Sequence, residues 1–221
     1  SRGLGDVYKR QAWGRGIYEN FKRFIQFQLT VNVSSVIVVF TSILLGLKAP
    51  FTALQLLWIN IIMDGPPALT LGLEPIYDDL MNRPPTGRGD NIISKTMFLR
   101  IGLTGLYISV IFLCQYVFNF LGAAHGEMNT VLFTLFALFQ LFNAFNCREL
   151  HATSIFKHLF QNRIMLLVIF ITFLLQILII QFAGAFFGTV PLGFAMWLKI
   201  FALTFSVILI SELVKLFLRR K

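Results

Sequence analysis

One strongly apolar stretch of the sequence, residues 56–73, contains both an amide and a carboxylate side chain. Asn60 and Asp64 are four residues apart, so on a helix they occupy the same face. Their oxygens are the kind of ligand that hard cations prefer. Because ionisable groups are costly at membrane depth and are rarely found there without a function, the pair predicts a cation site on a transport path. The alternative is that Asp64 simply pairs with a lysine or arginine.

Two consecutive prolines, Pro66 and Pro67, follow this pair. Neither has a backbone N–H, so in an α-helix the carbonyls of Ile62 and Met63 lose their donors. Irregular backbone at membrane depth is tolerated only where protein buries it or where it lines a cavity. We therefore expect an interrupted helix whose free carbonyl oxygens lie beside the amide and the carboxylate.

Two other amides could contribute to the same site. Asn32 lies in the middle of the first apolar segment, where an amide needs a partner inside the bundle, and we interpret it as a ligand or a direct neighbour of Asp64. Gln140, Asn143 and Asn146 recur every three residues, which predicts a polar stripe facing the protein interior. Gln140 is the deepest of the three and is a candidate ligand, although hydrogen bonding between helices explains it equally well.

The composition indicates a membrane environment for these residues. Of 221 residues, 57% are hydrophobic and 13% charged, and the mean hydropathy is +0.75. These values are typical of a polytopic protein in contact with the lipid bilayer, so we expect an all-α integral membrane fold. The net charge of +9 falls in short loops and at the ends of apolar runs, which argues against a nucleic-acid partner.

Six apolar segments approach the roughly 20 residues that a spanning helix needs. They are residues 24–46, 53–73, 98–121, 129–147, 164–183 and 194–217. We group them as a six-helix transmembrane domain over residues 24–218, followed by a basic tail at 219–221. Residues 12–23 are amphipathic and enter the first segment without a breaker. They form either an interfacial helix or the lower part of a longer helix that rises from a cytoplasmic domain.

Lysine and arginine are distributed unequally between the two ends of these segments. Of the 19 such residues, three lie in residues 1–11, and one end has only Lys48 and Lys199. The other fourteen lie at the opposite end, where both chain termini are expected. Since cytoplasmic loops carry an excess of Lys and Arg, we expect a multi-pass protein with both termini in the cytoplasm.

Residues 1–11 have the features of a non-native artefact. The codons GAT GTG TAT AAG AGA CAG encode the segment Asp6–Gln11 and resemble a transposon end used to prepare sequencing libraries. We therefore expect the native sequence to begin near Ala12 and the chain to be a fragment of a longer protein.

The sequence contains none of the common catalytic motifs. It has no phosphate-binding glycine loop, no Ser/His/Asp set and no zinc-binding spacing. His125, His151 and His158 fall in loops and are interpreted as solvated, and Glu212 with Lys215 as a structural ion pair. If the chain is part of a pump, the residues that couple transport to an energy source must belong to another part of the parent protein.

From Gly14 to the C-terminus the chain resembles the C-terminal membrane half of P-type calcium-transporting ATPases, in particular the plasma-membrane type. The matching segments occur in the family's order and are GRGIY at 14–18, FQLTVNV at 27–33, LWINIIMD at 57–64, LMNRPP at 80–85, QLFN at 140–143 and NR at 162–163. The resemblance implies that the six segments are the fifth to tenth helices of a ten-helix pump. It assigns transported Ca²⁺ to Asn60 and Asp64.

The same resemblance implies partners outside this chain. These are the N-terminal half of the pump, with its first four helices and with actuator, phosphorylation and nucleotide domains that bind ATP and Mg²⁺. Loop 74–97 would contact the phosphorylation domain, residues 14–24 would form the stalk, and the location would be the plasma membrane. A missing helix would supply further calcium ligands. Asn60 and Asp64 alone give too few oxygens for a six- to eight-coordinate ion, so we expect the fragment to be inactive by itself.

Two departures from endoplasmic-reticulum-type relatives imply a single calcium site. Those relatives have a glutamate where this chain has Ser35, and a threonine ligand where it has Met63. Met63 is interpreted as a packing residue. Asp64 is then expected to alternate between a calcium-bound and a protonated form, which gives proton countertransport.

Other functions remain open from the sequence. The transported ion could be manganese or a monovalent cation, because oxygen ligands disfavour only soft metals. A self-contained six-helix secondary carrier or a structural membrane subunit is the alternative from another class. Secondary carriers often have two similar halves with paired broken helices, whereas only segment 53–73 is both broken and polar here.

Overall fold

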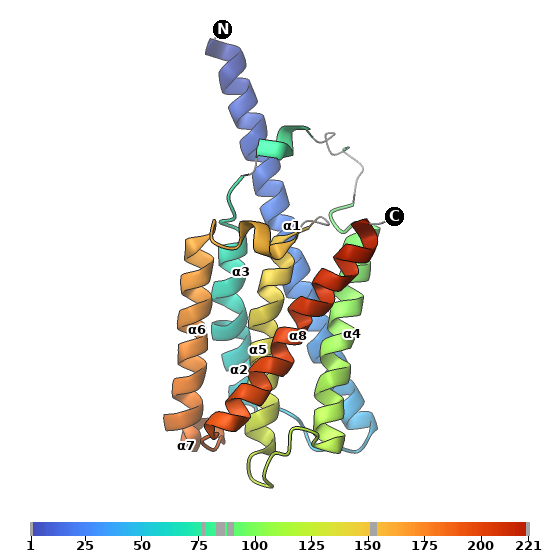
Figure 1. Cartoon of the computed structure of the whole chain (residues 1–221), viewed down its shortest axis with the longest axis vertical. Helices are drawn as coiled ribbons and strands as arrows, with labels where there is room; N and C mark the ends of the chain where they lie inside the picture. The colour runs from blue at the N-terminus through green and yellow to red at the C-terminus, as the bar shows by residue number, and fades with distance from the viewer. Residues whose placement is uncertain (1, 77, 83–86, 88–90, 151–153, 220–221) are drawn as a thin grey trace.

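The computed structural model describes the whole chain except residues 1, 77, 83–86, 88–90, 151–153 and 220–221. His151 and part of the basic tail therefore lie outside the described residues. Within the described part every regular element is a helix (Figure 1). The elements are α1 (Arg2–Leu44), α2 (Ala53–Trp58), π-helix η1 (Ile59–Asp64), α3 (Gly65–Leu71), 3₁₀-helix η2 (Asp78–Asn82), α4 (Lys95–Phe118), α5 (Met128–Arg148), 3₁₀-helix η3 (Ile155–His158), α6 (Arg163–Phe182), α7 (Gly184–Phe187) and α8 (Phe194–Arg219).

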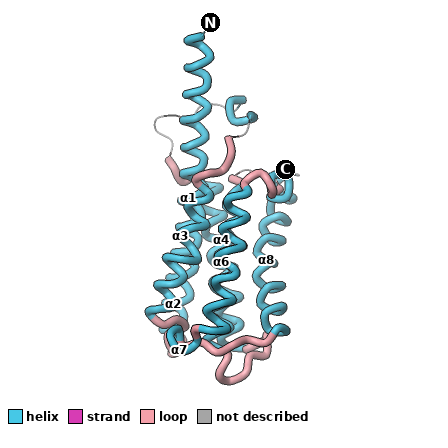
Figure 2. The backbone as a smooth tube through the Cα atoms, turned by 90° about the vertical axis from the view of Figure 1, so that its left-hand side faces the viewer, coloured by secondary structure: helices cyan, strands magenta, loops and turns pink. Residues whose placement is uncertain are grey.

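Five helices in the described residues are long and apolar enough to cross a membrane, one fewer than the six segments predicted. They are Asp6–Leu44, Lys95–Phe118, Met128–Arg148, Arg163–Phe182 and Phe194–Leu213. The remaining predicted segment, 53–73, does not form one long helix because it is divided into α2, η1 and α3. These pieces follow one another along the side of the bundle (Figures 1 and 2).

α1 is continuous from residue 2 to residue 44 and projects beyond the bundle at its N-terminal end (Figure 1). Residues 12–23 therefore continue directly into the first apolar segment, which is the geometry of the longer-helix alternative. The structure does not test the origin of residues 1–11, and their non-native character stays a prediction.

α5 is the central helix of the bundle. Its apolar window is 89% buried, compared with 28–33% for the other four long helices. Phe133, Phe136 and Phe139 are fully buried on it, and the Phe136 ring lies 5.1 Å from Phe51 and 5.9 Å from Phe112. Because α5 is surrounded by other helices, polar residues on it face protein rather than lipid.

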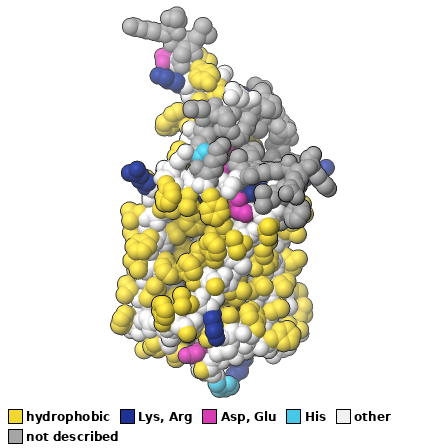
Figure 3. Space-filling view, in the orientation of Figure 1, with side chains coloured by type: hydrophobic (Ala, Val, Ile, Leu, Met, Phe, Trp, Pro, Cys, Tyr) yellow, Lys and Arg dark blue, Asp and Glu magenta, His cyan; other side chains and the backbone are white. Residues whose placement is uncertain are grey.

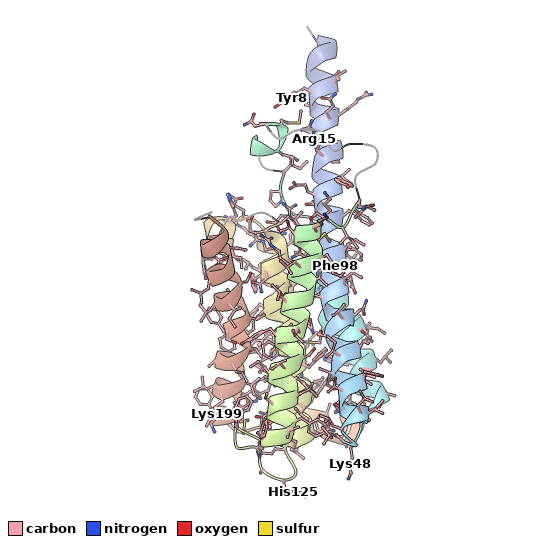
Figure 4. All side chains as sticks on the ribbon, turned by 90° about the vertical axis from the view of Figure 1, so that its right-hand side faces the viewer. Tyr8, Arg15, Lys48, Phe98, His125 and Lys199 are labelled. Atoms are coloured by element: carbon pink, nitrogen blue, oxygen red, sulfur yellow. The ribbon has the colours of Figure 1, made fainter. Side chains whose placement is uncertain are left out.

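The outer helices expose many large apolar side chains, and Figure 3 shows apolar side chains covering the face of the bundle that it presents. Lys48, His125 and Lys199 lie at the end opposite to the N-terminal part of α1 (Figure 4). Both chain termini lie at the other end (Figure 1). An apolar belt between two polar ends is the surface that a bilayer requires.

Candidate cation site

The break in the second apolar segment begins with a well-defined helix start. The Thr52 side chain accepts a hydrogen bond from the Gln55 backbone N–H at 3.2 Å, and the Gln55 side chain accepts one from the Thr52 N–H at 3.0 Å. This capping box fixes the start of α2. After six residues the helix widens into η1, and Pro66 and Pro67 then occupy the first turn of α3.

The π-helical turn leaves one carbonyl without a donor in either the α-helical or the π-helical register. A carbonyl at residue i accepts from residue i+4 in an α-helix and from residue i+5 in a π-helix. For Ile62 these two donors would be Pro66 and Pro67, and neither has an N–H. The carbonyl of Met63 differs, because Ala68 offers an N–H in the π register. The break therefore leaves the Ile62 oxygen without a helical partner.

Asp64 ends the π-helical turn and is buried. Its side chain is only 2% exposed, and neither carboxylate oxygen has a hydrogen-bond partner. The alternative in which a lysine or arginine neutralises Asp64 is therefore not realised among the described residues. A buried carboxylate without a partner is energetically costly, and such groups are typical of functional sites that bind something else.

Asn60 does not share the buried environment of Asp64. It is exposed, whereas Met63 is 0% exposed and belongs to the main hydrophobic core, as its interpretation as a packing residue requires. The extra residue in a π-helical turn changes the facing of side chains that an α-helical spacing would align. Asn60 thus lies at the same helix break as Asp64, but it is exposed whereas Asp64 is buried.

The two remaining candidates also differ in burial. Asn32 is exposed on α1, whereas Gln140 is 0% exposed on α5, which contacts η1. The Gln140 Nε2 donates to the Ser34 Oγ at 3.3 Å, and its Oε1 has no partner. The predicted stripe of amides does face the interior, since Asn143 and Asn146 are 1% and 6% exposed. Gln140 therefore brings a further unpartnered oxygen into the interior of the bundle.

No group of three or more His, Cys, Asp and Glu side chains gathers in the part of the chain that the structure describes. A cation at the break would consequently be bound by oxygens of a single carboxylate, amides and backbone carbonyls. This donor set suits hard cations.

Comparison with known proteins identifies the family. The sequence matches the family described as "Cation transporting ATPase, C-terminus" over residues 48–217. The chain belongs to this family.

Relatives of this family member include several plant calcium pumps. The chain is 39% identical over 209 residues to the "Probable calcium-transporting ATPase 6, plasma membrane-type" of Oryza sativa subsp. japonica. The matched region covers 92% of this chain and 20% of that protein. It is 39% identical to "Calcium-transporting ATPase 8, plasma membrane-type" of Arabidopsis thaliana over 88% of this chain and 19% of that protein. The chain thus spans about a fifth of the length of these relatives.

This cation-transporting ATPase domain also contains a buried ionic cluster that sequence reasoning missed. Arg148, at the end of α5, donates to Glu74 from Nη2 at 2.6 Å and from Nε at 3.1 and 3.2 Å. Their side chains are 1% and 0% exposed. The Asn162 Nδ2 donates to Glu74 Oε2 at 2.8 Å and to the carbonyl of Thr70, in α3, at 3.1 Å.

The same cluster extends to α1. The Asn20 Nδ2 donates to the carbonyls of Gly72 and Glu74 at 3.0 and 2.9 Å. Arg23 Nε donates to the carbonyl of Arg148 at 2.7 Å. The cluster therefore joins α1, the end of α3, α5 and the start of α6. The one sequence signal was an acidic residue directly after segment 53–73 and an arginine directly after segment 129–147.

The predicted pair at the end of α8 is confirmed. Lys215 Nζ lies 3.1 Å from Glu212 Oε1, which also accepts from the backbone N–H of Ile155 at 3.1 Å. Glu212 therefore has a structural role in holding the link before α6, as the sequence interpretation required.

Proposed function

We propose that this chain is the membrane translocation part of an ATP-driven calcium pump. Its relatives are calcium-transporting ATPases, and the chain is a membrane protein of their family. The observation that carries the proposal is the Asp64 carboxylate, which is buried at a helix break with both oxygens unpartnered. An oxygen site of this kind, at a break in an apolar segment, is suited to Ca²⁺.

The ion would be held at the break by Asp64, by the Ile62 carbonyl and by the Asn60 amide. Gln140 would approach from α5, and Asn32 from α1 would be a direct neighbour. These groups remain too few and too divided between buried and exposed positions to surround a six- to eight-coordinate ion. We infer that helices outside this chain cover Asn32 and Asn60 and complete the site, and that the chain alone neither binds calcium tightly nor hydrolyses ATP.

A single calcium site with proton countertransport is the most economical mechanism. With one carboxylate at the break, one divalent ion would bind when Asp64 is ionised. A proton would replace the ion on Asp64 after release, because an ionised carboxylate without a partner is unstable in an apolar interior. The end that carries both termini would face the cytoplasm, where ATP and Mg²⁺ bind to the remainder of the pump.

A chimera tests this function directly. Residues 12–221 would replace the matching segment of the rice relative, and calcium uptake would be measured in vesicles, together with calcium-dependent phosphorylation by ATP. We expect uptake with the native segment and background uptake with Asp64→Asn. Glu127→Gln is the matched control and should retain uptake. It removes a carboxylate at the residue directly before α5.

Two outcomes would contradict the proposal. Uptake that survives Asp64→Asn would exclude Asp64 as the ligand. Transport of two calcium ions per ATP by the active chimera would exclude the single site. Uptake of manganese in preference to calcium would change the ion but keep the site.

A further inference from the structure

A separate cavity lies between α1, α4, α5 and α8, towards the end of the bundle that carries the chain termini. Its volume is about 70 Å³, and its lining residues include Gln26 of α1, Arg100 of α4, Asn146 of α5 and Lys215 of α8. Since a water molecule needs roughly 10–15 Å³ measured in this way, the cavity has room for about five groups of that size. None of these residues belongs to the cation site.

Two cationic side chains line this cavity. Arg100 Nη1 donates to the backbone carbonyls of Glu149 and Leu150 at 3.1 and 2.8 Å, and Lys215 Nζ donates to Glu212 at 3.1 Å. A guanidinium has five N–H donors and an ammonium has three. Both side chains therefore retain donors for an acceptor inside the cavity, and phosphate oxygens are the acceptors that such cations bind best.

Three buried amides of the lining have unpartnered atoms. The Oε1 of Gln26 and the Oδ1 of Asn146 lack donors, and the Nδ2 of Asn143 lacks an acceptor. Gln26, Asn143 and Asn146 are 5%, 1% and 6% exposed. Because unsatisfied buried polar groups are costly, the cavity requires an occupant that both donates and accepts hydrogen bonds.

The rim of the cavity is apolar and faces the outside of the bundle. Leu103 and Ile210 belong to the lining, yet they are 51% and 37% exposed. They continue into the exposed side chains Leu99 and Leu106 of α4 and Leu213 of α8. The cavity therefore combines a polar interior with an apolar opening on the belt that contacts lipid.

We propose that this cavity binds the headgroup of an amine-bearing phospholipid. Its phosphate accepts hydrogen bonds from Arg100, Lys215 and the Asn143 amide. Its ammonium group donates to the free oxygens of Gln26 and Asn146, and its acyl chains pass over the apolar rim. A free phosphate has no ammonium group to donate to these two oxygens, and a choline headgroup has no N–H. The inference is independent of the proposed calcium site.

The binding test uses the purified 221-residue chain in nanodiscs with equal amounts of phosphatidylethanolamine and phosphatidylcholine. After mild detergent extraction, native mass spectrometry counts the lipids that remain on each chain. We expect one retained phosphatidylethanolamine per chain, favoured about tenfold over phosphatidylcholine. Ser211→Phe fills the cavity and should remove this preference, as should Lys215→Met.

Lys199→Met is the matched control, because it removes a lysine at the opposite end of the bundle and should keep the preference. Circular dichroism of each variant shows whether it remains helical. If a variant fails to fold, a competition experiment on the unmodified chain takes its place. Soluble phosphoethanolamine is added, and it should displace the retained lipid. Equal retention of the two lipids would overturn the proposal, as would a preference that survives Ser211→Phe. If inorganic phosphate occupies the cavity and no lipid is retained, the bound phosphate group does not belong to a lipid, and the proposal is overturned.

Discussion

Removing Arg148 should destabilise the bundle more than any surface substitution. The guanidinium makes three contacts of 2.6–3.2 Å with the Glu74 carboxylate and two with the carbonyls of His158 and Leu159. Both charged side chains are at most 1% exposed. Breaking one half of a buried ion pair costs about 3–5 kcal/mol, because it leaves the other charge buried without its partner. We expect this loss for Arg148→Met.

The double variant separates charge pairing from packing. When Glu74→Leu accompanies Arg148→Met, no buried charge remains from the pair, so we expect about half of the lost stability to return. Recovery is incomplete because the carbonyls of His158 and Leu159 still lose their donors, at about 1 kcal/mol each. Arg148→Lys keeps the charge but not the bidentate geometry, and should fall between the native chain and Arg148→Met.

The assay is unfolding of the chain in mixed micelles with increasing sodium dodecyl sulfate, followed by circular dichroism. Glu127→Gln is the control. It removes a carboxylate that accepts one hydrogen bond, from the Ala124 N–H at 3.1 Å, and should cost about 1 kcal/mol or less. The reasoning is refuted if the free energy of unfolding lost in the double variant equals the sum of the losses in Arg148→Met and Glu74→Leu alone. The two side chains would then act independently.

Three further predictions concern other parts of the bundle and use the same unfolding assay. Asp64→Asn should stabilise the chain by about 1–3 kcal/mol, because it replaces an unpartnered buried carboxylate by a less costly amide; a loss of stability would indicate a hidden partner. Gly105→Val should cost about 1–3 kcal/mol, since an added Cβ would lie 3.0 Å from Val33, while Gly102→Val has open space and should be tolerated. Thr52→Ala removes the cap of α2 and should cost about 1 kcal/mol, and an unchanged midpoint would contradict that role.

Sequence reasoning succeeded where the determining interactions are local. Apolar length and charge distribution predicted the membrane class, and Pro66 and Pro67 predicted an interruption, because each acts through its own missing N–H. The π-helical turn was not predictable, because an α-helical spacing does not reveal an extra residue in a turn. For that reason Asn60 and Asp64 were expected together, whereas one is exposed and the other is buried.

The buried ion pair was beyond sequence reasoning for a different reason. Glu74 and Arg148 are 74 residues apart, and no periodicity connects the two positions. Each directly follows one of the predicted apolar segments, in a connection between helices, which is where charged residues in a membrane protein usually lie. Only the meeting of α3, α5 and α6 at one end of the bundle brings them together and excludes water.

Buried polar groups are paired at the two ends of the broken segment but not in its middle. Thr52 caps the start of α2, and the last turn of α3 is held through Asn162 and the fully paired Glu74. Between them neither carboxylate oxygen of Asp64 has a hydrogen-bond partner, and the Ile62 carbonyl has prolines at the positions of its α-helical and π-helical donors. A sequence that satisfies buried polar groups at both ends could satisfy them in the middle as well. Under the proposed function, the unpaired oxygens of Asp64, held between these two fixed ends, bind a cation and release it again.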